Sequence, residues 1–150
     1  AIYSSLIATA PQSYKATSFH AAREPGLAVE GYLSRLRTYC HCSDACLVTS
    51  LVYIDRVTKR HPDFAVNSLS VHRLLAACTV LAAKFWDDVY YSNAYYAKVC
   101  GLGLRELNSL EARLAQLLGW RLGVSAEEFA DYCEFILSAV PGEPPPAAAA

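Results

Sequence analysis

The stretch NSLSVHRLLAACTVLAAKFWDD, residues 67–88, decides the fold of this chain. Its apolar residues fall on nearly every side of a helical projection, so a helix here has no face to leave in water and must be surrounded by other elements. Five further segments repeat apolar residues at helical spacing, and no segment alternates with a period of two over a useful length. The sequence therefore predicts an all-α fold, a helix bundle packed around a central buried helix over residues 67–88.

The other predicted helices are bounded by capping and stop signals. Ser43 and Asp44 are a helix-start signal, and Pro62 follows a basic helix end. Gly101 marks one helix end, and Ser125 caps the final helix, which has two glutamates in its first turn. The predicted helices span residues 29–39, 44–61, 93–100, 104–118 and 125–140.

Length and composition favour a single domain. The chain has 150 residues, of which 54% are hydrophobic and 18% are charged. Charges such as Asp55 and Lys84 interrupt every apolar run before it reaches the roughly 18 residues that span a bilayer, so we expect no membrane partner. We expect an N-terminal arm at 1–18, one domain at 19–140 and a disordered Pro/Ala-rich tail at 141–150, with the excess apolar content forming a protein interface.

The charge balance argues against a nucleic-acid partner. The chain has 13 Lys and Arg against 14 Asp and Glu, whereas a nucleic-acid binder favours a strongly basic face. Residues 1–10 lack a signal-peptide pattern, so we expect reduced cysteines and a location in the cytoplasm, the nucleus or both. The chain contains no methionine, and we expect it to be a fragment of a longer protein.

No catalytic or metal centre is predicted. Cys42 and Cys46 have the spacing of a zinc-binding pair, but no second pair completes the four ligands that structural zinc requires. The four histidines lie near helix ends or on amphipathic helices, and no local pattern presents a nucleophile on a strained turn. We therefore expect no metal, no cofactor and no enzymatic activity.

Two charged residues interrupt the apolar stripes of predicted helices. Lys84 shares a stripe with Ala77 and Leu81, and Glu111 shares a stripe with Leu114. A charge inside an apolar stripe must find a partner, because an unpaired buried charge is strongly unfavourable. Either the charges are satisfied without a partner protein, because the two residues pair with each other or extend their charged ends to solvent, or both stripes reach an interface where a partner protein supplies the counter-charges.

A third charge, Asp55, follows an apolar run and is expected to be buried. A buried carboxylate needs a compensating cation, and removing one member of such a pair is costly. Arg35, Arg37 and Arg73 are the possible partners, and Arg73 is our first choice for a structural ion pair with Asp55.

Three segments resemble the cyclin box: CLVTSLVYIDRV (46–57), VHRLLAACTVLAAKFWDDVYYSNAYYAKV (71–99) and ELNSLEARLAQLLGWRLGVSAEEF (106–129). The likeness is closest to the P-type or U-type cyclins, relatives of the cyclin that governs phosphate-starvation signalling, and covers about residues 18–137. It implies a five-helix cyclin-box fold with one flanking helix before it and one after. It also implies a regulatory subunit that binds and activates a cyclin-dependent serine/threonine kinase; the alternative is a cyclin-fold transcription or scaffold adaptor that activates no kinase.

The resemblance also implies kinase-binding residues. Lys84 and Glu111 match the cyclin lysine and glutamate that hydrogen-bond backbone near the kinase helix carrying the conserved glutamate, and Phe85 and Leu81 match apolar contacts to that helix. Asp55 matches an aspartate that pairs with a first-helix arginine in many cyclins. The first helix lacks the Met-Arg-Ala-Ile-Leu signature of cell-cycle cyclins, so their substrate-docking patch is not carried over.

Overall fold

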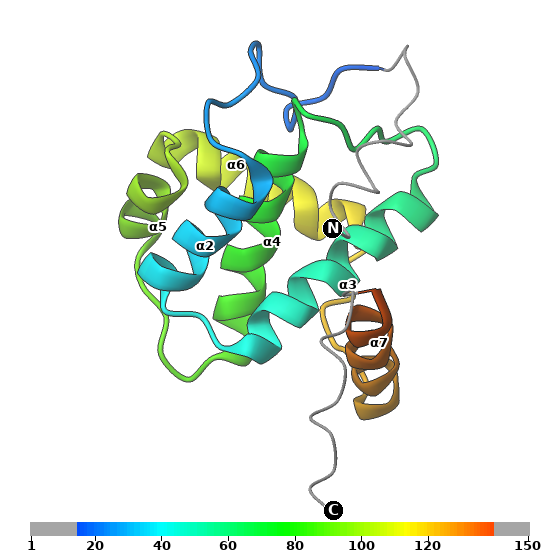
Figure 1. Cartoon of the computed structure of the whole chain (residues 1–150). Helices are drawn as coiled ribbons and strands as arrows, with labels where there is room; N and C mark the ends of the chain where they lie inside the picture. Colours follow the sequence, from blue (N-terminus) through cyan, green and yellow to red (C-terminus); the bar gives the residue numbers. More distant parts are fainter. Residues whose placement is uncertain (1–14, 140–150) are drawn as a thin grey trace, which may run out of the picture.

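The computed structural model describes residues 15–139, and within this part the secondary structure is entirely helical. The all-α prediction is confirmed. None of the helices in the described part is long and apolar enough to cross a bilayer. The helices, labelled as in Figure 1, are α2 (Val29–Cys40), α3 (Asp44–Arg60), α4 (Val71–Trp86), α5 (Asn93–Cys100), α6 (Leu104–Leu117) and α7 (Ala126–Ala139).

The helix α4 occupies the centre of the bundle, as the sequence predicts (Figure 1). Every residue from 74 to 83 is buried, and α4 contacts α2, α3, α5 and α6. Small residues let α3 approach closely: the Cys46 thiol donates to the Thr79 carbonyl oxygen at 3.5 Å, and the Ser50 hydroxyl lies 3.5 Å from the Thr79 hydroxyl. The polar groups where α3 crosses α4 are therefore hydrogen-bonded rather than left without partners.

The N-terminus of α4 begins at Val71, later than predicted, because polar side chains hold residues 67–70 in a turn. The Asn67 side-chain oxygen accepts from the Leu69 amide at 3.0 Å, and the Ser70 hydroxyl accepts from the Asn67 amide at 3.0 Å. The Ser70 hydroxyl also donates to the Ala65 carbonyl oxygen at 2.9 Å. Such local side-chain bonds compete with helical hydrogen bonding.

The other end of α4 lies at Trp86, because the next residue, Asp87, accepts hydrogen bonds from the start of α3. Asp87 has extended backbone, with φ −86° and ψ 141°. Its carboxylate accepts from the Ser43 amide at 3.2 Å and from the Ser43 hydroxyl at 2.6 Å. The end of α4 is thereby joined to the start of α3.

The helix α7 follows the bundle and packs on α3 (Figure 1). It corresponds to the flanking helix expected after the cyclin box. Residues 15–28 contain no helix that could be the flanking helix expected before it, and residues 1–14 lie outside the described part. The predicted tail at 141–150 also lies outside the described residues.

The predicted ion pair between Asp55 and Arg73 is wrong. The Asp55 carboxylate lies 2.8 Å from the Lys59 ammonium one helical turn away and accepts a hydrogen bond from the Tyr132 hydroxyl of α7. Its side chain is 34% exposed, so it is only partly buried. Burial, together with the Asp55 carboxylate, raises the pKa of Tyr132, which keeps this hydroxyl protonated as a donor. Asp55 thus joins α3 to α7 rather than to the central helix.

Arg73 has other partners because it lies near the start of α4, away from α7. Its guanidinium pairs with the Glu106 carboxylate at the start of α6 and donates to the Ser18 carbonyl oxygen at 3.1 Å. The pair joins two helix N-termini and the segment before α2. Arg73 is a structural residue, as predicted, but at a different junction.

The six cysteines are free thiols, and all except Cys133 are buried. Interaction with the Cys100 thiol and burial raise the pKa of Cys40, and interaction with the Cys42 thiol and burial raise the pKa of Cys46. Burial raises the pKa of Cys78, which behaves as a protonated apolar core residue. Among residues 15–139, no three side chains of the His, Cys, Asp and Glu types gather as a metal site would require.

The junction between α3 and α7 gives a first prediction. Asp55→Ala and Tyr132→Phe should each lower the free energy of unfolding by about 1 kcal/mol, because each removes the same hydrogen bond. The double variant should lose less than the sum of the two, since the residues act as a pair. Urea unfolding of the single and double variants measures this coupling.

Arg73→Ala is the matched control, because its partners lie elsewhere. Combined with Asp55→Ala, it should give additive losses of stability. A strong coupling between these two substitutions would instead support an Asp55–Arg73 pair and contradict the observed contacts.

Candidate docking site

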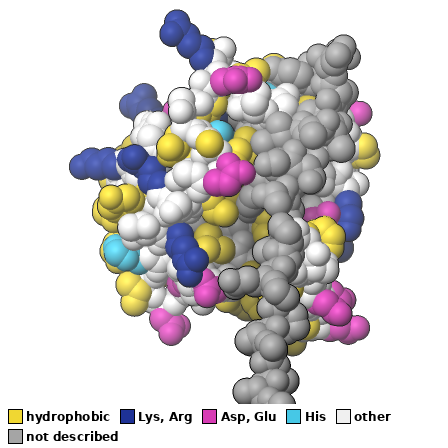
Figure 2. Space-filling view, viewed as in Figure 1, with side chains coloured by type: hydrophobic (Ala, Val, Ile, Leu, Met, Phe, Trp, Pro, Cys, Tyr) yellow, Lys and Arg dark blue, Asp and Glu magenta, His cyan; other side chains and the backbone are white. Residues whose placement is uncertain are grey.

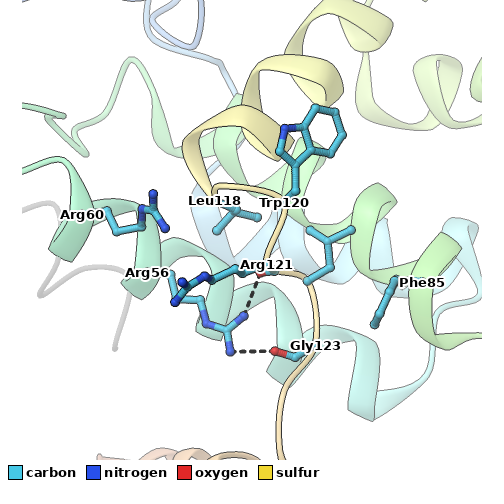
Figure 3. Close-up of a pocket in the computed structure, with 8 residues that line it drawn as sticks. Arg56, Arg60, Phe85, Leu118, Trp120, Arg121 and Gly123 are labelled. Carbon is cyan, nitrogen blue, oxygen red and sulfur yellow. Dashed lines mark hydrogen bonds between the residues drawn. The ribbon is translucent and has the colours of Figure 1, made fainter.

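A pocket of about 640 Å³ lies between the C-terminal half of α3, the end of α4 and the segment that follows α6 (Figure 3). We call it the Trp120 groove. Arginine side chains line one end of it, and Phe85 lies at the other. Its lining residues are Arg56, Arg60, Phe85, Leu118, Trp120, Arg121, Leu122 and Gly123.

The turn that ends α6 places Trp120 on the surface. The Trp120 amide donates to the Ala115 carbonyl oxygen at 2.9 Å and the Gly119 amide donates to the Gln116 carbonyl oxygen at 2.9 Å, which is a Schellman motif. Gly119 has φ 60° and Trp120 has φ 61°, so both are left-handed. The left-handed region is uncommon for a bulky side chain and costs of order 1–3 kcal/mol.

The absence of a side chain at position 119 also leaves room for Arg60. A Cβ atom there would lie 2.7 Å from a terminal nitrogen of Arg60, which packs against the glycine backbone. Trp120 is 70% exposed, so burial of its indole offsets little of the cost of this strained backbone. Strain combined with an exposed aromatic side chain marks the turn as a candidate binding site.

Two residues of α3 hold the wall of the groove in place. The Tyr53 hydroxyl donates to the Leu122 carbonyl oxygen at 2.7 Å, and burial raises the pKa of Tyr53 to about 12. The Arg56 guanidinium donates to the carbonyl oxygens of Arg121 at 2.9 Å and Gly123 at 2.8 Å. It also pairs with the Glu128 carboxylate at 2.8 Å. These bonds fix the segment at 121–123 before any partner binds.

Lys84 and Glu111 pair with each other, the first of the two alternatives that the sequence leaves open. The Lys84 ammonium lies 2.8 Å and 3.0 Å from the two Glu111 carboxylate oxygens. The side-chain amide of Asn93 also donates to Glu111 at 2.8 Å and to Asn108 at 2.7 Å. The ion pair therefore joins α4 to α6, and α5 supports it through Asn93.

The Lys84–Glu111 pair is not sealed from solvent. Its side chains are 29% and 16% exposed, respectively. A lysine ammonium has three donors and the pair uses two, so one N–H remains for another acceptor. Lys84 also directly precedes Phe85, which lines the groove. The pair lies at the place where the buried part of α4 reaches the surface.

The predicted apolar site residues have different exposures. Phe85 is 50% exposed and lies edge-on to Trp86, with ring centroids 5.2 Å apart. Leu81 is only 8% exposed and belongs to the hydrophobic core one turn earlier. Phe85 can touch a partner directly, whereas Leu81 supports the helix from inside.

The sequence pattern does not single out Trp120 and Leu122 as site residues. The one available signal was a tryptophan directly after the helix-ending Gly119, in a segment with no apolar period. Nothing in the sequence showed that this segment lies beside Phe85, 35 positions earlier in the chain, since that proximity comes from packing of α6 on α4.

The surface outside the groove carries charges of both signs. On the face shown in Figure 2, Lys and Arg side chains are interspersed with Asp and Glu, and apolar side chains lie between them.

Comparisons with known proteins agree with the motif likeness. The cyclin family model matches residues 3–122. Cyclin-U4-1 of Arabidopsis thaliana is 42% identical over 127 residues, which are 85% of this chain and 63% of that protein. Cyclin-P4-1 of Oryza sativa subsp. japonica is 38% identical over 122 residues, 81% of this chain and 58% of that protein. The PHO85 cyclin-like protein psl1 of Schizosaccharomyces pombe is 36% identical over 121 residues, 80% of this chain and 50% of that protein.

The chain spans between half and 63% of the length of these curated relatives. The match nevertheless includes α2 to α6, from the first packed helix to the turn that carries Trp120. The resemblance to P-type and U-type cyclins is confirmed, as is the cyclin-box fold. The cyclin family model matches most of this chain, and U-type and P-type relatives match it at 42% and 38% identity. The chain therefore belongs to the cyclin family.

Proposed function

We propose that this cyclin is the regulatory subunit of a cyclin-dependent serine/threonine kinase and binds that kinase through the Trp120 groove. The observation that carries the proposal is the pair of exposed aromatic side chains, Phe85 and Trp120, on walls that internal hydrogen bonds already hold in place. A fixed apolar groove binds with a smaller ordering cost than a mobile loop does. The proposed partner element is the kinase's regulatory helix.

Each part of the site has a role in this proposal. Phe85, Trp120 and Leu122 receive an apolar side chain of the kinase helix and exclude water around it. The free N–H of Lys84 donates to a backbone carbonyl oxygen of the kinase, while Glu111 holds the ammonium in position. A contact of this kind gains strength as docking removes the remaining solvent.

The cyclin contributes position rather than chemistry. Holding the kinase helix inward completes the kinase's own Lys–Glu ion pair, which positions the nucleotide phosphates. Every catalytic group then belongs to the kinase. We place the complex in the cytoplasm or nucleus. The printed name of one relative refers to PHO85, so a PHO85-type kinase belongs among the first partners to test.

The chain alone should phosphorylate nothing, but adding it should raise the activity of a cognate kinase many-fold. The reason is that the kinase helix lacks an external brace until the cyclin binds. Phosphate transfer to a histone-type substrate, measured with and without the chain across the kinases of the source organism, tests this. If a kinase binds without activation, the chain is an adaptor; if none binds, the regulatory role is refuted.

Phe85→Ala and Trp120→Ala should each weaken kinase binding by a factor of roughly 30 or more, as for interface residues worth at least about 2 kcal/mol. The melting temperature should change little, because these side chains are 50% and 70% exposed. Calorimetric titration beside thermal melts measures both quantities. Leu137→Ala is the control, since Leu137 is 75% exposed on α7 and does not line the groove. Equal effects from the control would mean that general apolar exposure, rather than this groove, drives binding.

Glu111→Ala should destabilise the free domain by about 1–3 kcal/mol, because it leaves the Lys84 ammonium and an Asn93 donor half-buried without their acceptor. A loss of 1 kcal/mol should lower the melting temperature by about 2–4 °C. Glu111→Gln keeps an acceptor and the side-chain volume, so it should lose less stability. Thermal melts of both variants give the stability, and titration of the folded fraction gives the affinity. An unchanged melt for Glu111→Ala would show that the pair does not hold α4 to α6.

A further inference from the structure

Within the described residues, two arginines at one end of the Trp120 groove have no counter-charge. Arg56 is neutralised by Glu128, at 2.8 Å. The side chains of Arg60 and Arg121 make no ion pair or hydrogen bond within residues 15–139, although both line the pocket. Figure 3 shows both at the α3 side of the groove, away from Phe85.

The Arg60 side chain lies against the turn that ends α6. Its guanidinium packs against Gly119, where the absence of a side chain makes room for it. It therefore lies beside the Trp120 turn instead of extending freely from the end of α3. Arg60 is otherwise exposed, so its guanidinium is accessible to an anion at the mouth of the groove.

The surroundings strengthen the attraction for an anion. Leu118 and Trp120 form apolar walls beside the two exposed guanidinium groups, so a docking segment that covers these walls would exclude water and lower the local dielectric. Neither guanidinium has a carboxylate partner within residues 15–139, so neither gains an ion pair in the free domain. A negative group from outside would supply the missing counter-charge and could accept hydrogen bonds from a planar guanidinium fork.

We propose that Arg60 and Arg121 bind an aspartate or glutamate carboxylate of the kinase segment that docks in the groove. This inference rests on the proposed function, because it names the chemistry of the partner at that same site. The partner segment presents an apolar side chain to Phe85 and Trp120 and an acidic side chain to the arginine end. The groove thus selects partners by charge as well as by shape.

A carboxylate fits this end better than a phosphate does. The Glu128 carboxylate already occupies Arg56 at the edge of the pocket, and a dianionic phosphate next to it would meet stronger repulsion than a single negative charge. A phosphate is also costlier to place against the apolar walls of Leu118 and Trp120. The Arg56–Glu128 pair is thus a precedent for an arginine–carboxylate contact at this end of the groove.

Arg60→Glu, Arg121→Glu and the double variant test the inference against the cognate kinase. Removing one rim ion pair should weaken binding by about fivefold at low salt, and the double charge reversal should weaken it further. Raising the salt from about 50 to 500 mM should weaken wild-type binding but have little or the opposite effect on the double variant. Arg23→Glu is the control, because Arg23 is exposed outside the groove and its variant should bind like the wild type.

A charge swap identifies the partner group. Replacing an acidic residue of the kinase helix region with arginine should weaken binding to the wild-type cyclin and restore binding to Arg60→Glu or Arg121→Glu. Phosphatase treatment of the kinase should change nothing. Loss of the arginine-dependent binding after that treatment would identify a phosphate and overturn the carboxylate assignment.

The outcomes separate this inference from the proposed function. If the double arginine variant binds the kinase like the wild type while Trp120→Ala does not bind, the carboxylate contact is refuted and the kinase-docking role stands. If neither substitution affects binding, the groove is not the docking site and the proposed function fails as well.

Discussion

The complete burial of the middle of α4 is the constraint on which the rest of the structure depends. From residue 74 to 83 this helix has no solvent-facing side, so α2, α3, α5 and α6 must enclose it. Its small side chains let α3 approach closely, and the Thr79 groups are satisfied by the neighbouring helix. A hydrophobic helix of this kind gains its stability from contact on all sides and leaves its neighbours few alternative positions.

The candidate site begins where that burial ends. At its last turn α4 reaches the surface, and Lys84 and Phe85 appear directly after the buried stretch. The α6 helix packs on α4 and therefore brings Glu111 to Lys84 and carries the Trp120 turn to Phe85. The site thus consists of the exposed end of the core, which explains why its charged pair is half-buried and its aromatic side chains are held on a rigid base.

Rigidity and exposure have opposite effects on the stability of the segment that forms this groove. Exposed aromatic side chains and a left-handed Trp120 lower the stability of the free domain. The hydrogen bonds from Tyr53 and Arg56 hold the same segment firmly on α3. A binding surface gains from this combination, because the ordering cost is met during folding and not during association. In the proposed docking role, this fixed segment is the surface that braces the partner.

The sequence by itself determined the helices, the central position of α4 and the family likeness, because period, caps and motif order are local properties. It also singled out Lys84 and Glu111, since a charge in an apolar stripe needs a partner wherever the helix lies. Only the tertiary structure decided that these two residues pair with each other. Asp55 likewise found its partners in Lys59 and in Tyr132 of α7 rather than in an arginine, because that choice depends on which face of α3 the last helix covers. The groove itself was out of reach of the sequence for the same reason: its walls come from three segments whose proximity arises only when α4 is enclosed.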